Sequence, residues 1–343
     1  MGKYILKRVL QFIPVFIGVT IILFAMKTIV PGDPISMITG GRSVPEQTRL
    51  QLEVENNMIY GDENGRPIYD ENGDTIPVPI WEQYIRYMDD LLHGDLGTSY
   101  QKKRPVTDIF AEKYPYTIKL AVCAICLEAV MGIGAGLVSA IKRYSFWDIL
   151  VTLITSVLVA VPAFWLGMIL QLTFGIWLKD LTGGAISLPI SGAGGPNSQY
   201  MDWVHYILPA FTLAAVSTAY TARIMRSQLL DVMNQDYIRT ARAKGLPEWA
   251  VVWKHGFRTA LLPVVTTILN HIPHIIGGSL VVERIFGWPG MGSLLFTSVS
   301  SRDYTVIMGL TVVIALTVLA TGILMDLVYR LVDPGVGWGG EGR

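Results

Sequence analysis

Four polar side chains lie inside otherwise apolar stretches, and they are the groups best placed to line a pathway for a substrate. Glu128 lies midway through one stretch, and Asn270, His271 and His274 lie in another. Such side chains are costly at the depth of a lipid bilayer, so they are functional candidates by default. Two hypotheses stay open: the group lines a water-filled pathway, or it forms hydrogen bonds between helices without contacting a substrate. Asn270 and His274, spaced i,i+4, would share one helix face.

Patterns for enzymatic or redox chemistry are missing or misplaced in the sequence. Neither the phosphate-binding pattern G-x-x-x-x-G-K-[ST] nor the zinc-protease pattern H-E-x-x-H occurs. The stretch GIGAG (132–136) imitates a nucleotide loop, but it follows no predicted strand and lies in an apolar run, which indicates close helix packing. Cys123 and Cys126 lie in the same run without a βαβ pattern beside them, so we interpret them as packing residues. His271 and His274 have no acid near them in sequence, so we predict no metal site and no catalytic residue.

The composition places these residues in a membrane protein. Of 343 residues, 51% are hydrophobic and only 16% are charged, too few charges to cover a soluble domain. A helix needs roughly 20 apolar residues to cross the hydrocarbon core. The third candidate stretch contains Pro162, so it is either one kinked helix or a span followed by a surface helix. The predicted fold class is an all-α membrane protein with six transmembrane helices, at about 9–30, 117–141, 149–178, 203–222, 259–282 and 304–329.

Lysine and arginine residues predict the orientation of these helices. They concentrate at both termini and in alternate connections, so these segments are expected to face the cytoplasm. Segment 1–30 then holds a retained first helix, which is too long for a signal peptide. Segment 31–115, with 8 basic and 15 acidic residues, is expected to be extracytoplasmic. Residues 116–333 form a core domain with five helices, and the Gly-rich tail 334–343 is expected to be disordered.

Two features stand out within the predicted outer segment. Residues 60–79 repeat Asp-Glu-Asn-Gly at 62–65 and 70–73, which predicts an inserted β-hairpin with tight turns. The next stretch, 80–92, places apolar side chains at helical spacing and predicts a short amphipathic helix.

A basic segment at about 231–258, between the fourth and fifth apolar stretches, has the pattern of two helices joined by a sharp turn. Residues 231–243 contain no Gly or Pro and are expected to form one helix. Gly245 suits a helix C-cap in the left-handed conformation. Pro247 and Glu248 suit the first turn of a second helix, where proline and negative charge are favoured.

The second helix, about 247–254, is predicted to carry an exposed apolar face. Its expected surface residues are Trp249, Val252 and Trp253. Two hypotheses account for tryptophans on a basic cytoplasmic helix. They lie in the lipid headgroup layer, or they anchor a protein partner, since Trp is enriched at binding hot spots.

The segment RTARAKG (239–245), followed by LLP (261–263), resembles the cytoplasmic loop of the integral membrane permeases of ATP-binding-cassette importers, in their dipeptide/oligopeptide branch. In that family the loop has the pattern E-A-A-x-x-x-G, and its short helix docks into a groove of the ATPase subunit. Gly245 matches the glycine, whereas Arg239, Thr240 and Ala241 occupy the glutamate and two alanine positions. Further stretches resemble the same branch in order: LKRVLQFIPVFIGVTII (6–22), PGDP (31–34), HGDLGTSY (93–100) with RPV (104–106), VPAFWLG (161–167), VVERIFGWPGMG (281–292), SRDY (301–304) and DLVYRLVDP (326–334).

This resemblance implies a transport subunit and not an enzyme. ATP and Mg²⁺ would be bound by two separate ATPase subunits, so no cofactor is expected in this chain. A second homologous permease would complete the pathway, and an extracytoplasmic binding protein would deliver di- or oligopeptides to it. The implied location is the plasma (inner) membrane of a prokaryote, in contact with lipid and without a nucleic-acid partner. The residues implied in ATPase coupling are Arg239, Thr240, Ala241, Gly245, Pro247, Glu248, Trp249, Trp253 and His255. The candidate pathway residues are Glu128, Phe164, Trp165, Asn270, His271 and His274.

Several alternatives stay open at this point. Members of the same branch carry nickel chelates or oligosaccharides, and no residue here excludes them. A membrane-embedded enzyme would need a buried pair, for which Glu128 with His271 or His274 is the only candidate. An ion channel would need a re-entrant segment, but the Gly-rich stretch 185–198 is better explained as an outer loop. Co-purification with an ATPase separates the importer from the enzyme and the channel.

Overall fold

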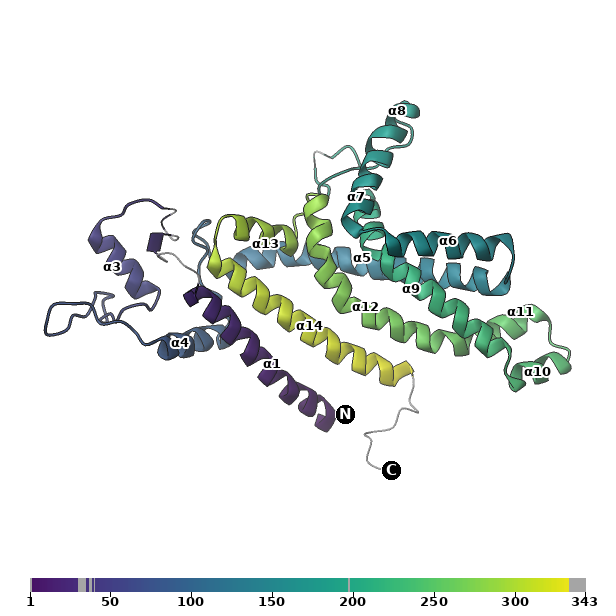
Figure 1. Ribbon diagram of the computed structural model, residues 1–343, viewed down its shortest axis with the longest axis horizontal. Helices are drawn as coiled ribbons and strands as arrows, with labels where there is room; N and C mark the ends of the chain where they lie inside the picture. Colours follow the sequence, from purple (N-terminus) through teal and green to yellow (C-terminus); the bar gives the residue numbers. More distant parts are fainter. Residues whose placement is uncertain (1, 30–34, 37–38, 40, 197, 333–343) are drawn as a thin grey trace. The chain divides into compact units, whose positions relative to one another are not determined.

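A computed structural model shows a chain of α-helices joined by turns and loops (Figure 1). It describes residues 2–29, 35–36, 39, 41–196 and 198–332, with side chains within 10–25, 35–36, 39, 41–196, 198–277 and 279–325. The stretch 31–34, the tail 334–343 and the side chains of 326–333 lie outside the described residues. The elements are α1 (Gly2–Ile29), α3 (Glu46–Glu55), α4 (Ile80–Leu92), α5 (Val106–Ile141), α6 (Phe146–Ala160), α7 (Ala163–Leu172), η1 (Thr173–Trp177), α8 (Leu178–Leu181), η2 (Asp202–Tyr206), α9 (Ile207–Met233), α10 (Asp236–Ala243), α11 (Glu248–Ala250), η3 (Val251–Phe257), α12 (Arg258–Ile285), α13 (Met291–Ser300) and α14 (Tyr304–Val332).

Several of these helices are long and apolar enough to cross a membrane. In the described residues there are 4 such segments: Val106–Ile141, Asp202–Met233, Glu248–Gly277 and Tyr304–Met325. The bent pair formed by α6 and by Ala163–Leu181 raises the number to 5 if it counts as one span. The first predicted span, 9–30, falls on α1, whose described apolar stretch Leu10–Ala25 is shorter than these segments. The all-helical membrane class is therefore confirmed, with four or five candidate spans in this part of the chain.

The third predicted span is broken at its proline. The helix axis turns by 110° between α6, which ends at Ala160, and the following helical stretch, which begins at Ala163. Val161 adopts an extended backbone with φ −88° and ψ 125°, because the ring of a following proline disfavours the helical conformation. Pro162 then stands directly before the first turn of α7. Pro162 therefore separates two helices at a steep angle, which the apolar periodicity alone could not reveal.

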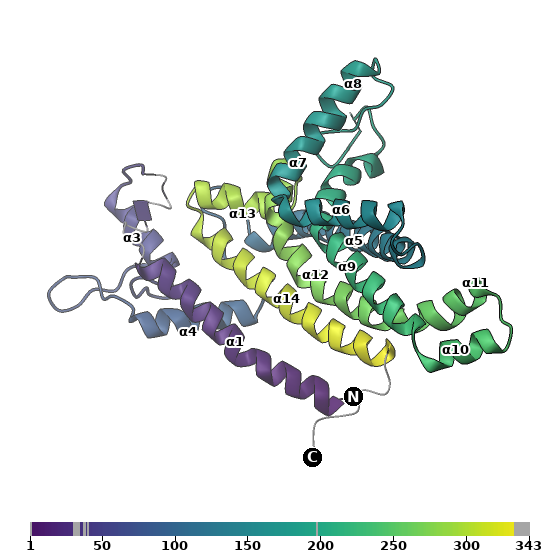
Figure 2. The ribbon, with the colours of Figure 1, turned by 45° about the vertical axis from the view of Figure 1, so that its right-hand side comes forward.

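The chain divides into two compact units, Met1–Lys113 with Leu294–Thr317, and Tyr114–Ser293 with Val318–Arg343. In the second unit α9 is the central helix, and it packs against α6, α7 and α12 (Figures 1 and 2). Its small residues from Ala210 to Ala222 are almost all buried. This run of small side chains lets neighbouring helices approach closely, as expected for helices that pack within a membrane.

Helix α5 makes its close approach to α9 through glycines. A Cβ atom at Gly132 would lie 2.7 Å from Cγ2 of Thr221, and one at Gly136 would lie 2.6 Å from Cβ of Met225. Both distances are too short for a real side chain, so only glycine fits at these two positions. The GIGAG stretch is therefore a helix-packing motif, as its place in an apolar run predicted.

The first unit has an aromatic cluster of its own. Phe24 of α1 meets Tyr84 of α4 edge to face, with ring centroids 5.5 Å apart, and Tyr87 lies 5.9 Å from the same ring. Met308 and Val312 of α14 complete the buried cluster. The predicted amphipathic helix 80–92 is confirmed as α4, and its tyrosine face is the one that packs.

The inserted segment forms the same turn twice. Asp62 and Asp70 each accept, through Oδ1, the backbone N–H groups two and four positions later, at 2.7–2.9 Å. Gly65 and Gly73 follow with φ of 74° and 87°, a conformation that glycine adopts without strain. The chain pairs only through isolated bridges, such as Tyr69 with Thr75, so the described residues form turns without a regular strand ladder. The repeated Asp-Glu-Asn-Gly sequence thus encodes two side-chain-capped turns.

Candidate functional site

A buried polar cluster lies between α5, α9 and α12 and contains two of the predicted pathway residues. Glu128 is 0% exposed. Its Oε1 accepts a hydrogen bond from Oγ1 of Thr221 at 2.7 Å and lies 2.6 Å from Nδ1 of His271. Its other oxygen, Oε2, is buried and has no hydrogen-bond partner among the described residues. The His271 side chain is 20% exposed, so the imidazole ring leads from the buried carboxylate toward the helix surface.

The other predicted pathway residues do not join this cluster. Asn270 and His274 of α12 are both exposed, and they lie on one face as their spacing predicted. Phe164 and Trp165 lie on α7 and are each about half exposed, at 49% and 48%. In the part of the chain that the structure describes, no hydrogen bond or ring contact connects these two aromatic residues to Glu128. An exposed Asn and His within an apolar helix favour contact with water or protein over contact with lipid.

The predicted coupling segment has the helix-turn-helix form, with one difference. The expected helix 231–243 is wrong as a single element, because α9 ends at Met233 and α10 begins at Asp236. Asn234 and Gln235 make the break: Gln235 adopts an extended backbone with ψ 153°, and side-chain amides of both residues reach carbonyls of the preceding turn. Asn competes with the backbone for hydrogen bonds in this way, which makes it a poor residue inside a helix.

Gly245 ends α10 in the left-handed conformation, as predicted. Its φ is 75°, its N–H donates to the carbonyl of Arg242 at 2.9 Å, and the N–H of Leu246 reaches the carbonyl of Ala241 at 3.4 Å. This pair of bonds is the Schellman arrangement that closes many helices. An ion pair of 2.7 Å between Arg242 and Glu248 then spans the turn. Hydrogen bonding to Glu248 raises the pKa of the Arg242 guanidinium.

A small apolar core holds the two helices of the coupling segment together. Ile238, Ala241 and Val251 are buried against one another, with Met233 packed beside them. Val252 is also buried, at 9%, so its predicted surface position is wrong; it lies in the π-helical turn η3, which packs against α9. Trp249 is 71% exposed and Trp253 is 51% exposed, as predicted. The remaining implied coupling residues are Arg239, Thr240 and Pro247, which are exposed, and His255, which is half-buried.

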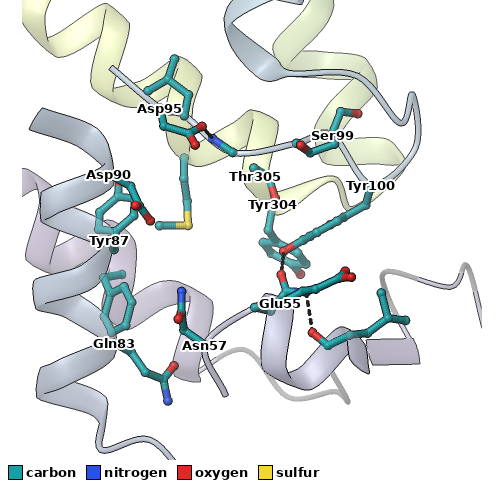
Figure 3. A pocket seen from close by; sticks show the side chains of 18 of the residues that line it. Glu55, Asn57, Gln83, Tyr87, Asp90, Asp95, Ser99, Tyr100, Tyr304 and Thr305 are labelled. Carbon is teal, nitrogen blue, oxygen red and sulfur yellow. Dashed lines mark hydrogen bonds between the residues drawn. The ribbon is translucent and has the colours of Figure 1, made fainter. Parts of the chain in front are cut away.

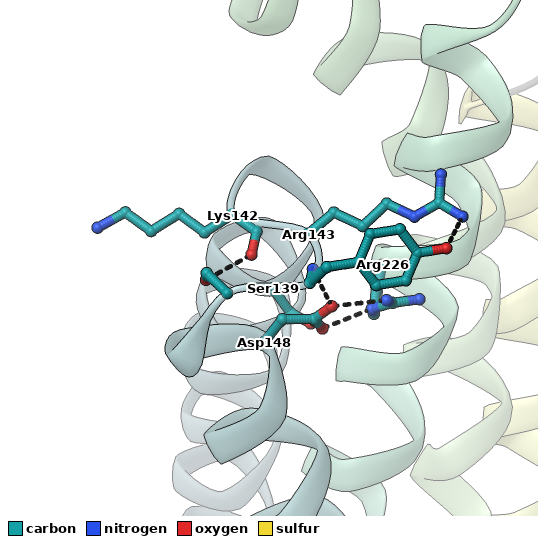
Figure 4. A network of polar contacts seen from close by, with 7 residues as sticks. Ser139, Lys142, Arg143, Asp148 and Arg226 are labelled. Carbon is teal, nitrogen blue, oxygen red and sulfur yellow. Dashed lines mark hydrogen bonds and ion pairs between the residues drawn. The ribbon is translucent and has the colours of Figure 1, made fainter.

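An ion-pair network fixes the connection between α5 and α6 to α9 (Figure 4). The Arg226 guanidinium donates from Nε and Nη2 to the two carboxylate oxygens of Asp148, each at 2.8 Å. Asp148 also accepts from Oγ of Ser139 and, at 2.9 Å, from the N–H of Tyr144. Its side chain is only 6% exposed. A bidentate, largely buried pair of this kind fixes two helices at a defined distance.

A second buried glutamate, Glu283, holds the stretch VVERIFGWPGMG in its folded shape. Glu283 is 0% exposed, and its Oε2 accepts the N–H of Gly292 at 2.6 Å and the N–H of Ser293 at 3.3 Å, in the first turn of α13. Its Oε1 accepts from Oγ1 of Thr117 on α5 at 2.7 Å. A carboxylate at a helix N-terminus satisfies free N–H groups and interacts favourably with the helix dipole. Glu283 therefore connects α12, α13 and α5.

The first unit encloses a polar pocket of about 500 Å³ (Figure 3). Its lining includes the acidic residues Glu55, Asp90 and Asp95, with Lys103 as the only basic lining residue among those described. Burial, together with the neighbouring carboxylates, raises the pKa of Asp90. Burial also raises the pKa of Tyr87 to about 12, and its hydroxyl has no partner among the described residues. The pocket is within the size range of ligand sites, roughly 300–1,000 Å³, and has a net negative lining.

Two stretches that the sequence singled out separately meet in the first unit. Asp303, from SRDY, is 2% exposed and accepts from Oγ of Ser99 at 2.5 Å and from the N–H groups of Tyr100 and Gln101 at 3.3 Å. Ser99 belongs to HGDLGTSY, more than 200 residues earlier in the chain. The Asp303 carboxylate thus caps the turn that leads into α5.

Sequence reasoning missed three of these polar anchors: Asp148, Glu283 and Asp303. Each is an acidic residue next to an apolar stretch, where the pattern of charges predicts the orientation of the helices but not the partners of a single carboxylate. A usable signal was present for Glu283, because Gly290 and Gly292 follow it closely. A Cβ atom at Gly290 would lie 2.5 Å from the Glu283 carboxyl carbon, so glycine is required there.

The sequence of this chain is similar to those of known transport proteins. Residues 132–338 match the family described as binding-protein-dependent transport system inner membrane component. The oligopeptide transport system permease protein AppB of Bacillus subtilis is 38% identical, over 97% of this chain and 99% of that protein. The dipeptide transport system permease protein DppB of Escherichia coli is 33% identical, over 97% and 98% of the two chains. The glutathione transport system permease protein GsiC of Pectobacterium atrosepticum is 36% identical, over 98% and 99%.

Solved structures support the fold. A chain of the MetNI methionine ABC transporter in an inward-facing conformation aligns with a TM-score of 0.52 and 16% sequence identity. The alignment covers 66% of this chain and 97% of that chain. The likeness concerns the arrangement of helices, because the identity is too low to carry residue roles.

Proposed function

The chain belongs to the family of binding-protein-dependent transport system inner membrane components, and we propose that it forms one half of the translocation pathway of a peptide importer. It is a permease subunit of an ATP-binding-cassette importer for di- or oligopeptides. The observation that carries this conclusion is similarity along almost the whole chain, at 38% identity over 97% of its length, to an oligopeptide permease. Dipeptide and glutathione permeases match over the same length, so nickel chelates and oligosaccharides are not favoured.

The polar face of α12 is the part of this chain assigned to the pathway. Asn270 and His274 are exposed, and His271 beside them is joined to Glu128. Amide and imidazole groups can exchange hydrogen bonds with the backbone of any passing peptide. This chemistry suits a transporter whose substrates share a backbone and differ in their side chains. Phe164 and Trp165 are proposed to line the same pathway from α7.

The segment 231–258 is assigned to contact with an ATPase subunit. Its internal core and Schellman turn support this assignment, because they hold α10, α11 and η3 as one rigid projection (Figure 2). Trp249 and Trp253 then present exposed indole rings on that projection. Motion of an attached ATPase would be transmitted through η3 into α12, since the helical path from Glu248 to Ile285 has no interruption.

The proposed assembly and orientation complete this account. Two ATPase subunits bind ATP and Mg²⁺, a second permease completes the pathway, and a binding protein delivers peptides to segment 31–115. Six spans with both termini in the cytoplasm are supported by the lysine and arginine pattern. The acidic pocket of the first unit then lies on the extracytoplasmic side.

Growth on peptides tests the transport function. A strain that requires one amino acid, and from which this chain is deleted, should grow when supplied with that free amino acid. It should not grow when a dipeptide or tetrapeptide is the only source. The chain supplied in trans should restore growth on the peptides. Equal growth on peptides with and without the chain would contradict peptide import, in a strain without other peptide transporters.

A further inference from the structure

An apolar pocket of about 420 Å³ lies beside α5, α7 and α9 in the second unit. Its lining includes Leu127 of α5, Leu170 of α7 and Phe211 of α9, and Cys123 lines it one turn before Leu127. The volume is within the range of ligand sites, roughly 300–1,000 Å³. The pocket shares no lining residue with the Glu128 cluster or with the coupling segment, so neither site accounts for it.

The side chains around this pocket give a water molecule little to bind. All are aliphatic or aromatic except Cys123, and the only other polar side-chain atoms belong to Trp203 and Tyr206. The indole N–H of Trp203 already donates to Sδ of Met201 at 3.4 Å. A buried water molecule typically makes about three hydrogen bonds. An apolar molecule therefore fills this space better than water does.

The surface of α5 next to the pocket shows which apolar molecule is available. Val122, Cys126 and Val130 are spaced four residues apart and form an exposed stripe, directly beside the pocket residues Cys123 and Leu127. Helix α5 is long and apolar enough to cross a membrane. An exposed apolar stripe on such a helix faces lipid tails, so the molecule next to the pocket is a lipid acyl chain.

Lys119 places a positive charge close to the pocket. It lies four residues before Cys123, and therefore about 6 Å along α5 on the same face. Its side chain is exposed and forms no ion pair or hydrogen bond with another described residue. A lysine near the end of an apolar helix extends its ammonium group toward the lipid headgroups. The charge is thus available to an anionic group at that level of the membrane.

Trp203 marks the same level independently. It lines the pocket from η2, directly before α9, and its side chain is 63% exposed. Tryptophan is enriched where lipid headgroups meet the hydrocarbon core, because its ring is apolar and its N–H is polar. A lysine on one helix and a tryptophan at the start of another therefore both indicate that the pocket begins at the headgroups.

We propose that this pocket binds one acyl chain of a membrane phospholipid and that Lys119 binds the phosphate of the same lipid. A bilayer is as apolar as the pocket, so the apolar lining does not select among lipids. Selection falls to Lys119, which favours anionic phosphatidylglycerol over phosphatidylethanolamine, whose own amine competes for the phosphate. The inference requires that the chain spans a membrane and does not depend on the solute that it carries.

Photochemical labelling of the complete transporter tests this proposal. Vesicles contain phosphatidylethanolamine and phosphatidylglycerol in equal amounts, and a trace of one of them carries a photoactivatable group on its acyl chain. Mass spectrometry of the digested chain then locates the label. Leu127 and Phe211 should be labelled more strongly than Val130, which is 73% exposed outside the pocket. Labelling of Leu127 and Phe211 no stronger than that of Val130 would overturn the proposal.

The choice of lipid tests the role of Lys119. Phosphatidylglycerol should label the pocket about five times more than phosphatidylethanolamine, the value of one lysine near an anionic lipid surface. Lys119→Gln should bring this ratio close to one, and Lys119→Arg should keep it. Lys179→Gln is the matched control, because Lys179 is exposed on α8 and does not line the pocket. Equal ratios in Lys119→Gln and Lys179→Gln would overturn the role of Lys119.

Two cysteines one turn apart provide a matched pair for filling the pocket. Cys123→Phe places a ring in the pocket, whereas Cys126→Phe places the same ring on the exposed stripe. Only Cys123→Phe should reduce labelling of Leu127 and Phe211. Equal labelling in the two variants would count against a lipid in the pocket. A cross-link from wild-type Cys123 to the second permease, without lipid label, would show that this partner fills the pocket and would overturn the proposal.

A second measurement uses the wild-type chain alone among its variants, so it does not require that any substitution is tolerated. The complete transporter is stripped of lipid in detergent and treated with an apolar thiol reagent. Added phosphatidylglycerol should slow the reaction of Cys123 and leave that of Cys126 unchanged. Inorganic phosphate, which has no acyl chain, should protect neither cysteine. Protection of Cys123 by phosphate alone, or equal protection of both cysteines by the lipid, would contradict the proposal.

Discussion

Replacing Glu283 by leucine tests whether this buried carboxylate connects three helices. The substitution keeps roughly the same volume but removes every acceptor from the site. The N–H of Gly292 and the hydroxyl hydrogen of Thr117, which now donate at 2.6 and 2.7 Å, then lose their buried acceptor, while Oγ1 of Thr117 still accepts from the N–H of Met291. Each such loss costs about 1–3 kcal/mol, so Glu283→Leu should destabilise the chain by about 3–5 kcal/mol.

Glutamine at the same position should be tolerated much better. Its carbonyl oxygen can accept from Gly292, and its amide nitrogen can donate to Oγ1 of Thr117. The charge and the hydrogen bond that Thr117 now donates are lost, so we expect a cost of about 1–2 kcal/mol. We therefore expect Glu283→Leu to be less stable than Glu283→Gln. This order follows from which groups at the site donate and accept hydrogen bonds, and not from burial alone.

Thermal unfolding of the detergent-solubilised chain, followed by size-exclusion chromatography after heating, measures the difference. At roughly 2–4 °C per kcal/mol, Glu283→Leu should lower the midpoint by roughly 6–20 °C. Glu112→Leu is the matched control, because that glutamate is 54% exposed and, among the described residues, forms its ion pair with exposed Arg104. Surface pairs of this kind contribute little to stability, because water screens them and two long side chains must be held in place. A midpoint for Glu283→Leu no lower than that of the control, or equal effects of Leu and Gln, would refute the reasoning.

Three other predictions concern the coupling segment, the orientation and the buried ion pair. Gly245→Val places a β-branched residue at φ 75°, at a cost of roughly 1 kcal/mol. The variant should insert into the membrane normally but recover less of the ATPase subunits in a pull-down. Gly245→Asn should recover more, because asparagine tolerates this backbone conformation. Equal recovery in the two variants would count against the turn geometry. A cysteine at Asn64, in a chain whose native cysteines are replaced, should react with an impermeant reagent in intact cells, and one at Lys244 should not; the reverse pattern would invert the orientation. Arg226→Ala should destabilise the chain by about 3–5 kcal/mol because it leaves the Asp148 carboxylate buried without its opposite charge. Adding Asp148→Ala to this variant should cost little more. Additive losses in the unfolding midpoint would show that the two residues are not coupled.

Local features were the most predictable from the sequence. The helix 80–92, the left-handed Gly245 and the glycine packing at 132–136 depend on residues that are close together in the chain. For the same reason Pro162 marked the place where the third apolar stretch breaks. The angle of 110° was not predictable, because it depends on how the helices on both sides pack.

Long-range polar contacts were the least predictable part. Glu128 is a candidate because it is an ionisable residue within an apolar run. The spacing of residues in the chain does not say whether His271 or His274 is its partner. The structure makes the choice through helix rotation: His274 lies on the exposed face, and His271 is turned toward α5. The absence of Gly and Pro from 231–243 does not reveal the break at Asn234, which arises because Asn favours a helix end through its side chain.

The most direct test of the central claim is peptide uptake by a reconstituted transporter. This chain, its partner permease and the two ATPase subunits are placed in proteoliposomes, with the binding protein and a radiolabelled dipeptide on the outside and ATP with Mg²⁺ on the inside. The account predicts that labelled peptide accumulates only when this chain and hydrolysable ATP are both present. Accumulation at the same rate without ATP, or ATP hydrolysis by the assembled complex without accumulation of any di- or oligopeptide, would contradict it.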